Sequence, residues 1–450
     1  MNSISRILIA NRGEIAARIL KTCKKLGIES VLVVSEADRE SLPSKMADRS
    51  ICIGPAPANE SYLKIELLIT AALGTNSDAI HPGYGFLSEN AGLAKACVKN
   101  GLIFVGPSAE AIQKMGNKLE AKKIAGKCGV KCIEGSSGIH RMSEAIDASK
   151  EIGFPVIIKA AGGGGGRGMK VVENLAQLEF AFDILSSEVL SAFGDGTLFI
   201  ERYFKNARHV EVQILGDQLG NIVHLGERDC SVQRRYQKII EESPCSVIHQ
   251  ALRERLCGSA VAIAREIEYD NCGTVEFVLD LDSKEFYFLE VNTRIQVEHP
   301  VTEQICGIDI VEHQIRSAAG EQLWMRQDEI KSRGHAIECR INAESSDGSF
   351  RPSPGRITEW HPPEDNCIRI DTHCTPGYLI PPFYDSLIAK VISTGSNRQE
   401  AISRMQSALR NFKVEGVETT IPFLQKILNS EDYVSGNFNT QWLEKFLSNL

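Results

Sequence analysis

The sequence predicts an α/β fold at the N-terminus followed by two α+β regions. Residues 6–34 read as strand, helix and strand, which is how an open parallel α/β sheet begins. From about residue 115 the pattern changes to longer helices and antiparallel strands, and from residue 334 a third region of alternating strand segments begins. The length of 450 residues agrees with about three domains.

The N-terminal sheet is predicted from short apolar runs. Four of them are expected as strands: residues 6–10, 30–34, 78–80 and 102–105. The helix between the first two places four residues on one stripe before it ends at Gly27: Ile15, Ile19, Cys23 and Leu26. The loop His81–Asn90 follows a strand, and ligands bind at the carboxyl ends of strands in open α/β sheets. A plain turn before a helix is the alternative.

Five consecutive glycines at 162–166 lie between two strand-like runs. With Gly168 they cost roughly 3–6 kcal/mol more to order than alanines would, so a need for bare backbone N–H groups close to phosphates is indicated. A strand follows the run, whereas the dinucleotide motif needs a helix there, and the Gly-Lys-Ser/Thr of a Walker loop is absent. We expect a glycine-rich lid over phosphates, with a flexible surface loop as the alternative.

Composition and charge exclude several classes of protein. The net charge of −8 argues against a nucleic-acid or anionic-membrane partner. No apolar run reaches about 18 residues, so no transmembrane helix is expected. The first strand begins too early to leave room for a targeting peptide, and the 13 cysteines form no Cys-x-x-Cys. We therefore expect a protein of the reducing cytoplasm.

Polar side chains gather on the hairpin predicted over residues 274–292. Glu276 lies in an apolar strand, and Glu290 and Asn292 lie on one face of the returning strand, because strand side chains alternate. These hard oxygen ligands favour magnesium beside substrate phosphates. The apolar neighbours indicate burial, and buried carboxylates need a cation. A pair of surface glutamates is the alternative.

If the chain stays extended beyond Asn292, then Arg294, Gln296 and Glu298 share the face of Glu290. Such a polar series opposite an apolar one is typical of a packed ribbon that carries a site. Earlier in the chain, His209, Glu211 and Gln213 share a face of another strand. The segment 227–238 is basic but short and flanked by acids, which favours a small anionic substrate near Lys238 over a polyanion.

Several long motifs resemble biotin carboxylase, the ATP-grasp subunit or domain of biotin-dependent carboxylases. The resemblance rests on residues 9–16, 81–90, 159–168, 209–213, 227–238, 335–344 and above all 292–300, and it covers nearly the whole chain. It implies a Rossmann-like N-terminal domain over 1–114, an ATP-grasp domain over 115–320 with a lid subdomain at about 131–204, and a C-terminal domain over 334–445.

The resemblance also implies the chemistry. ATP phosphorylates bicarbonate to carboxyphosphate, which breaks down to phosphate and carbon dioxide, and a ureido nitrogen of biotin captures the carbon dioxide. The implied ATP-binding residues are Lys118, Lys159, Gly165, Gly166, Glu201, Arg202, Tyr203, Phe204, His209, Gln233, Glu276 and Glu290. The implied ligands of two magnesium or manganese ions are Glu276, Glu290 and Asn292.

The remaining implied roles concern bicarbonate and biotin. Bicarbonate is expected on Lys238, Arg294, Gln296 and the backbone of Val297. Glu298 is expected to act as the base, so that Arg294, Glu298 and Lys238 form the catalytic set. Biotin is expected beside Tyr84, Arg294 and Arg340. Tyr236 stands where many members of the family carry histidine, and it receives no role.

The chain contains no biotinylation motif of the Ala-Met-Lys-Met type. The biotin carboxyl carrier protein and the carboxyltransferase are therefore expected as separate polypeptides, with a homodimer formed through the N- and C-terminal regions. Acetyl-CoA carboxylation in fatty-acid synthesis is the default role, although the sequence does not reveal the final carboxyl acceptor. Two alternatives remain: an ATP-grasp ligase that joins another carboxylate to an amine, and a non-catalytic ATP-binding module.

Overall fold

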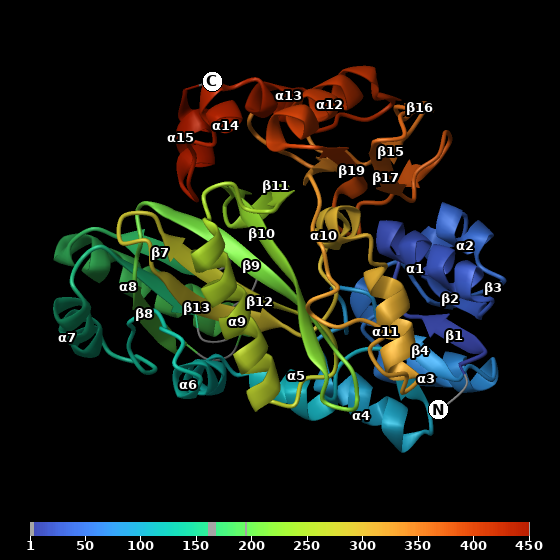
Figure 1. The fold of residues 1–450 in the computed structure, drawn as a ribbon, viewed down its shortest axis with the longest axis horizontal. Helices are drawn as coiled ribbons and strands as arrows, with labels where there is room; N and C mark the ends of the chain where they lie inside the picture. The colour runs from blue at the N-terminus through green and yellow to red at the C-terminus, as the bar shows by residue number, and fades with distance from the viewer. Residues whose placement is uncertain (1–3, 161–167, 194–195, 450) are drawn as a thin grey trace.

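The computed structural model describes residues 4–160, 168–193 and 196–449. Two large sheets, one small three-stranded sheet and two short two-stranded sheets organise the described parts of the chain. In Figure 1 the blue N-terminal part lies to one side of the large antiparallel sheet, the teal and green part with the small sheet lies to the other, and the orange to red C-terminal part lies above. The predicted succession of an open parallel α/β region and α+β regions is confirmed.

The N-terminal part is a parallel five-stranded sheet in the order β3-β2-β1-β4-β5, covered by helices. Its elements are β1 (Arg6–Ile9), α1 (Gly13–Leu26), β2 (Glu29–Ser35), α2 (Leu42–Met46), β3 (Arg49–Gly54), α3 (Ile65–Gly74), β4 (Ala79–His81), α4 (Ala91–Lys99), β5 (Ile103–Phe104) and α5 (Ala109–Gly116), with 3₁₀ turns at Glu36–Asp38 and Ala58–Glu60. In α1 the predicted stripe is buried at Ile15, Ile19 and Cys23. Gly27 ends the helix in the left-handed conformation, with φ of 69°.

The small sheet is antiparallel, in the order β7-β6-β8, and two helices flank it. The elements of this part are α6 (Lys118–Lys127), α7 (Met142–Ile152), β6 (Val156–Ala160), β7 (Met169–Val172), α8 (Leu175–Phe193) and β8 (Leu198–Arg202). Lys159 pairs with Met169 across the hairpin, as the predicted strands on either side of the glycine run require. Gly165 and Gly166 themselves lie outside the described residues. A separate apolar core, which includes Val156 and Leu185, packs under this sheet.

The large sheet has eight antiparallel strands in the order β13-β12-β9-β10-β11-β14-β19-β17. Its central elements are β9 (Ala207–Gly216), β10 (Ile222–Arg234), β11 (Gln237–Ser243), α9 (Gln250–Glu266), β12 (Asn271–Asp280), β13 (Phe286–Asn292), α10 (His299–Cys306) and α11 (Ile310–Ala318). The sheet continues beyond residue 334, because β11 pairs with β14 from Ile240↔Cys339 to Ser243↔Ala336. The central and C-terminal regions therefore share one sheet.

The C-terminal part adds the last strands of that sheet and a cover of helices over a large apolar core. Its elements are β14 (His335–Asn342), β15 (Gly355–Arg356), β16 (Glu359–His361), β17 (Ile368–Thr372), β18 (Leu379–Ile380), β19 (Leu387–Gly395), α12 (Arg398–Asn411), β20 (Lys413–Glu415), α13 (Ile421–Leu428), α14 (Glu431–Ser435) and α15 (Trp442–Ser448). Across the described parts of the chain, no helix combines the length and apolar character that a membrane span requires.

The hairpin of β12 and β13 forms as predicted, but the extension of the ribbon beyond it is wrong. β13 ends at Asn292, and residues 293–298 form a loop that leads into α10. β13 is the edge strand of the sheet, and its last register pair is Asn292 with Thr274. Beyond that pair the chain leaves the sheet, although β12 continues to Asn271, and Pro300 in the first turn of α10 starts a helix. We call residues 293–298 the catalytic loop, because two residues predicted to be catalytic, Arg294 and Glu298, lie in it.

Candidate functional site

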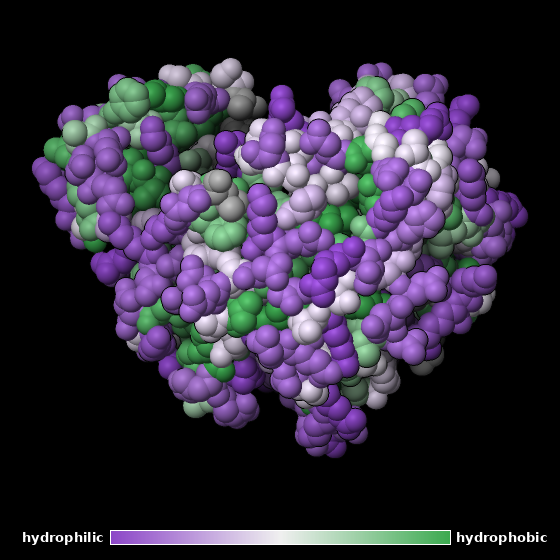
Figure 2. Space-filling model, turned by 90° about the horizontal axis from the view of Figure 1, so that it is seen from above, coloured by the Kyte–Doolittle hydropathy of each residue, from purple (hydrophilic) through white to green (hydrophobic). Residues whose placement is uncertain are grey.

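A cavity of about 1360 Å³ opens between the small sheet, the large sheet and the two terminal parts. Seen from above, the outline of the molecule is notched between two lobes, and hydrophilic side chains cover most of this face (Figure 2). The cavity brings together every predicted site residue that the structure describes. They are Tyr84, Lys118, Lys159, Glu201, Arg202, Tyr203, Phe204, His209, Gln233, Lys238, Glu276, Glu290, Asn292, Arg294, Gln296, Val297, Glu298 and Arg340.

Two lysines and one glutamate form the small-sheet wall of the cavity, which we call the nucleotide side because the predicted ATP-binding residues Lys159 and Glu201 lie on it. Glu201 on β8 lies 2.5 Å from Lys159 Nζ on β6 and 2.5 Å from Lys122 Nζ on α6. Burial disfavours the ionised carboxylate, but the two ammonium groups outweigh it and lower the pKa of Glu201 to about 2. The wall therefore keeps an excess of positive charge that suits a phosphate chain.

The remaining nucleotide-side residues follow β8 toward the large sheet. Phe204 stacks on Tyr287 with the ring centroids 4.7 Å apart, which fixes one aromatic face beside the cavity. His209 faces the same space, and its Nδ1 lies 3.0 Å from Gln233 Nε2. Burial lowers the pKa of His209, but Glu276 outweighs this effect and the net pKa is raised.

The hairpin carries two carboxylates side by side. Glu276 and Glu290 are register partners on β12 and β13. Glu276 accepts from Asn292 Nδ2 at 2.7 Å and pairs with His209 Nε2 at 3.0 Å. Burial opposes ionisation of Glu276, yet Lys238 and His209 hold its pKa well below the usual range. Burial and the charge of Glu276 raise the pKa of Glu290. Paired hard oxygens in a carboxylate-rich wall fit a divalent cation such as magnesium.

Lys238 on β11 lies at the centre of the acidic residues. Its Nζ contacts Glu211 at 2.6 Å, Glu276 at 3.0 Å and Glu298 at 2.7 Å. Burial lowers the pKa of Lys238, but the three carboxylates outweigh it and raise the pKa well above its usual value. The ammonium group is therefore a fixed positive charge in the cavity.

Side chains from all three parts of the chain hold the catalytic loop. Arg294 Nε donates to Glu89 of the N-terminal part at 3.0 Å. Arg340 of β14 donates to Glu298 at 2.9 Å and to Glu241 at 2.6 Å. Fully buried Lys390 of β19 donates to the carbonyl of Val297 at 2.8 Å. The loop therefore has its shape only when the three parts are assembled.

Burial alone disfavours an ionised carboxylate at Glu298, but Lys238 and the arginines Arg340 and Arg228 outweigh it and lower the pKa. The neighbouring Glu241 differs, because burial raises its pKa to about 7 and Arg340 offsets this only in part. Glu298 is thus an anion flanked by cations. Its surroundings suit a base that acts once substrates separate it from those cations.

Tyr84 lies in the loop after β4, as predicted. Its hydroxyl donates to Glu14, whose other oxygen lies 3.1 Å from Lys390 Nζ. Burial and the charge of Glu14 raise the pKa of Tyr84 well above its usual value, so the phenol stays neutral. Tyr84 is therefore linked through Glu14 and Lys390 to the carbonyl of Val297 in the catalytic loop.

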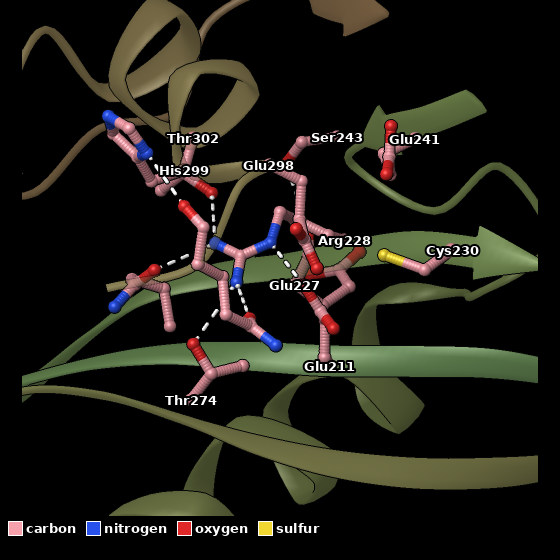
Figure 3. Close-up of polar contacts among 12 residues, drawn as sticks. Glu211, Glu227, Arg228, Cys230, Glu241, Ser243, Thr274, Glu298, His299 and Thr302 are labelled. Carbon is pink, nitrogen blue, oxygen red and sulfur yellow. Dashed lines mark hydrogen bonds and ion pairs between the residues drawn. The ribbon is translucent and has the colours of Figure 1, made fainter. Parts of the chain in front are cut away.

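Arg228 of β10 lies behind the residues that line the cavity. Its guanidinium, at the centre of Figure 3, contacts Glu211, Thr274 and Thr302. Sequence reasoning assigned no role to five residues that hold the site: Lys122, Glu89, Arg228, Glu241 and Lys390. Glu89 and Arg228 lie inside motifs that carry the family resemblance, and Lys122 follows Lys118 by one helical turn. Glu241 and Lys390 gave no signal of their own, since their partners are distant in sequence.

Three family comparisons cover most of the chain. The family "Biotin carboxylase, N-terminal domain" matches residues 3–112. The family "Carbamoyl-phosphate synthase L chain, ATP binding domain" matches residues 117–326. The family "Biotin carboxylase C-terminal domain" matches residues 338–445.

Relatives match along the full length. Biotin carboxylase 1 of Bacillus subtilis is 50% identical over 98% of this chain and 99% of its own. A pyruvate carboxylase chain of Methanothermobacter thermautotrophicus is 47% identical over 98% of this chain and 90% of its own. A biotin carboxylase structure from Campylobacter jejuni has a TM-score of 0.95 and 47% identity, covering 98% of this chain and 99% of that one.

A further structure comes from Hydrogenobacter thermophilus. It is the biotin carboxylase domain dimer of 2-oxoglutarate carboxylase, in complex with MgADP, ADP and bicarbonate. It matches with a TM-score of 0.95 and 44% identity over 99% of this chain and 98% of that one.

The fold and the family match define an ATP-grasp ligase, with residues of the small sheet and of the large sheet lining one cavity. The chain belongs to the biotin carboxylase family. The predicted resemblance and the predicted enzyme class are thereby confirmed.

Proposed function

We propose that this enzyme carboxylates biotin on a separate biotin carboxyl carrier protein, using ATP and bicarbonate by way of carboxyphosphate. The observation that carries the proposal is the catalytic loop. It brings Arg294, Gln296 and Glu298 beside Lys238 and opposite the Glu276–Glu290 pair. One cavity thus contains positive charges that suit an anion, a carboxylate that suits a base, and oxygen ligands that suit a metal ion.

On the nucleotide side, we assign the phosphates of ATP to Lys118, Lys159, Gly165 and Gly166. The adenine pocket is assigned to Glu201, Arg202, Tyr203 and Phe204, and ribose or phosphate contacts to His209 and Gln233. The support is the excess positive charge around Glu201 and the aromatic face at Phe204. Phosphoryl transfer depends mainly on positioning and charge neutralisation, which these residues supply.

We assign two magnesium or manganese ions to Glu276, Glu290 and Asn292. The support is the register pairing of the two glutamates and the position of all three oxygen donors in a carboxylate-rich wall of the cavity. The bound ions would neutralise the charge of the β- and γ-phosphates. The MgADP in the Hydrogenobacter thermophilus relative agrees with a divalent ion in such a site.

Bicarbonate is assigned to Lys238, Arg294, Gln296 and the backbone of Val297. A bicarbonate oxygen attacks the γ-phosphorus while Glu298 takes the proton of the bicarbonate hydroxyl, and the bond from phosphorus to ADP breaks. Replacing the Lys238–Glu298 and Arg340–Glu298 contacts by substrate contacts frees Glu298 to accept that proton. Closure of the predicted glycine-rich lid over this cavity keeps water from the labile carboxyphosphate.

Biotin is assigned to Tyr84, Arg294 and Arg340, where its ureido nitrogen loses a proton to the phosphate released from carboxyphosphate and bonds to the carbon dioxide released with it. The two guanidinium groups stabilise the biotin enolate and the departing phosphate. The partners proposed are the carrier protein, a carboxyltransferase and a second copy of this chain. Acetyl-CoA in fatty-acid synthesis is the proposed final acceptor, while the matches to pyruvate and 2-oxoglutarate carboxylase chains supply the competing acceptors.

The test measures transfer of ¹⁴C from bicarbonate to a biotinylated carrier domain, with free biotin as a second acceptor. We expect label on the carrier that depends on ATP and magnesium, and ADP release that requires bicarbonate and increases with biotin. A rate of ATP turnover that stays the same when bicarbonate and biotin are added would refute the proposal. Label on an amine substrate instead would favour a different ATP-grasp ligase. Carboxyltransferase chains that co-purify with the enzyme would identify the acceptor.

A further inference from the structure

Arg228 is a fully buried arginine that the proposed chemistry leaves without a role. Its guanidinium donates five hydrogen bonds, and Figure 3 shows it among strands and the first turns of α10. The acceptors are Glu211 Oε1 at 2.5 Å, Gln213 Oε1 at 2.8 Å, Thr302 Oγ1 at 3.0 Å, Thr274 Oγ1 at 3.1 Å and Gln296 Oε1 at 2.6 Å. Burying a guanidinium charge is costly. The five acceptors around Arg228 therefore indicate a site built around this residue.

The contact with Gln296 fixes the orientation of an amide. Arginine carries only donors, so the carbonyl oxygen of Gln296 must face Arg228, and its NH₂ group must face the other way. On that other side, Nε2 donates to Glu276 Oε1 at 2.8 Å. The reversed amide would place its NH₂ against the guanidinium and its oxygen against the ionised Glu276. Both neighbours therefore favour the same orientation, which turns a donor toward the cavity.

The contact with Glu211 serves the same wall of the cavity. One oxygen of Glu211 accepts from Arg228 and the other accepts from Lys238 at 2.6 Å. Lys238 and Gln296, both assigned to bicarbonate, are thus each at most two contacts away from Arg228. A bound anion needs hydrogen-bond donors and positive charges. Arg228 orients one of each, Gln296 and Lys238, toward the proposed position of bicarbonate.

We propose that Arg228 is a positioning residue that makes Gln296 a hydrogen-bond donor to bicarbonate. This inference rests on the proposed function, because it concerns the same substrate. Arg228 itself touches no substrate. Its effect reaches bicarbonate through Gln296, so the affinity for bicarbonate should depend on Arg228 while the affinity for ATP should not.

The test compares Arg228→Lys with a matched variant, Arg208→Lys. Arg208 is also fully buried in the large sheet, where it pairs with Asp229 at 2.8 Å, donates to the carbonyl of Gly436 and stacks on Phe438, all of them outside the catalytic loop. We expect Arg228→Lys to raise the KM for bicarbonate at least tenfold and the KM for ATP less than threefold. We expect Arg208→Lys to lower the melting temperature without separating the two KM values. An unchanged bicarbonate KM in Arg228→Lys, or an equal rise in both KM values, would overturn the proposal.

A double-mutant cycle tests the route through Gln296. In a Gln296→Ala background, the Arg228→Lys change should raise the bicarbonate KM less than threefold further. A full additional tenfold rise would show that Arg228 acts elsewhere. Should Arg228→Lys not fold, Gln296→Glu keeps an acceptor for Arg228 but offers no donor, so the bicarbonate KM should again rise at least tenfold, and an unchanged value would overturn the proposal. A wild-type enzyme without bicarbonate-dependent turnover would refute the proposed function instead.

Discussion

The two walls of the cavity differ in the balance of charge around their glutamates. On the nucleotide side, Glu201 lies between two lysines that lower its pKa to about 2. On the side of the catalytic loop, burial raises the pKa of Glu241 to about 7, and burial with the charge of Glu276 raises that of Glu290. One wall has cations in excess and the other has carboxylates in excess. The walls are thus matched to phosphates on one side and to metal ions on the other.

The two walls also differ in what holds them together. The nucleotide side rests on a small sheet with its own apolar core. The catalytic loop has no pairing strand and depends on Glu89, Lys238, Arg340 and Lys390 from different parts of the chain. Substitutions in the first wall should therefore affect ATP alone, whereas substitutions in the second should affect bicarbonate, the metal requirement or the chemical step.

The largest effect is expected for Arg294→Ala. Removing a cation beside the developing negative charge should reduce kcat/KM for biotin carboxylation by about 10²–10³-fold. The measurement is the rate of biotin-dependent ADP release. Arg351→Ala, at an exposed position, is the control and should keep the wild-type rate. Unchanged carboxylation by Arg294→Ala would mean that this arginine does no chemistry.

The metal assignment predicts the next largest effect. Glu290→Gln removes one oxygen charge from the hairpin pair, so the magnesium concentration for half-maximal ATP turnover should rise about 10–100-fold. A magnesium titration of ADP release measures it. Asp282→Asn, in the exposed turn of the same hairpin, should leave the magnesium requirement unchanged. An equal magnesium requirement in the two variants would show that Glu290 is not a ligand of the metal ion.

Lys159→Met tests whether the nucleotide side acts on ATP alone. Because Lys159 is proposed to contact a phosphate of ATP, removing its charge should raise the KM for ATP about tenfold and leave the KM for bicarbonate unchanged. Lys170→Met on the neighbouring strand, where the side chain is exposed, is the matched control. A rise in the KM for bicarbonate as well would contradict the claim that the nucleotide side acts on ATP alone.

The smallest effect concerns stability and pH. The pKa of Glu241 is raised from 4.5 to about 7 by burial, so the folded protein binds more protons in this window and loses stability as the pH rises through it. Glu241→Gln removes that loss. Its melting temperature relative to wild type should rise between pH 5 and pH 8 by about 2–4 °C.

Glu201→Gln is the control for this pH series. The pKa of Glu201 lies near 2, so its stabilising contribution is lost only as the pH falls below about 4.5 and is constant between pH 5 and pH 8. Its melting temperature relative to wild type should therefore stay level over that range. A parallel change in both variants would contradict the difference in protonation between Glu241 and Glu201.

Much of this site could be predicted from the sequence, because side-chain types and local periodicity reveal strands and ligands. The hairpin and its face with Glu290 and Asn292 followed from alternation alone. The end of β13 could not be predicted, since it depends on the position of that strand at the sheet edge. The partner of Arg294 could not be predicted either, because Glu89 lies 205 residues earlier and only the assembled fold brings them together.

The central claim is that both walls act on one reaction, in which bicarbonate attacks the γ-phosphate of ATP. The most direct test uses ¹⁸O-labelled bicarbonate and measures the label in inorganic phosphate by mass spectrometry. A bicarbonate oxygen that bonds to phosphorus stays there when carboxyphosphate breaks its C–O bond, so we predict one ¹⁸O per phosphate. Phosphate without ¹⁸O, formed in the same bicarbonate-dependent turnover, would contradict the account.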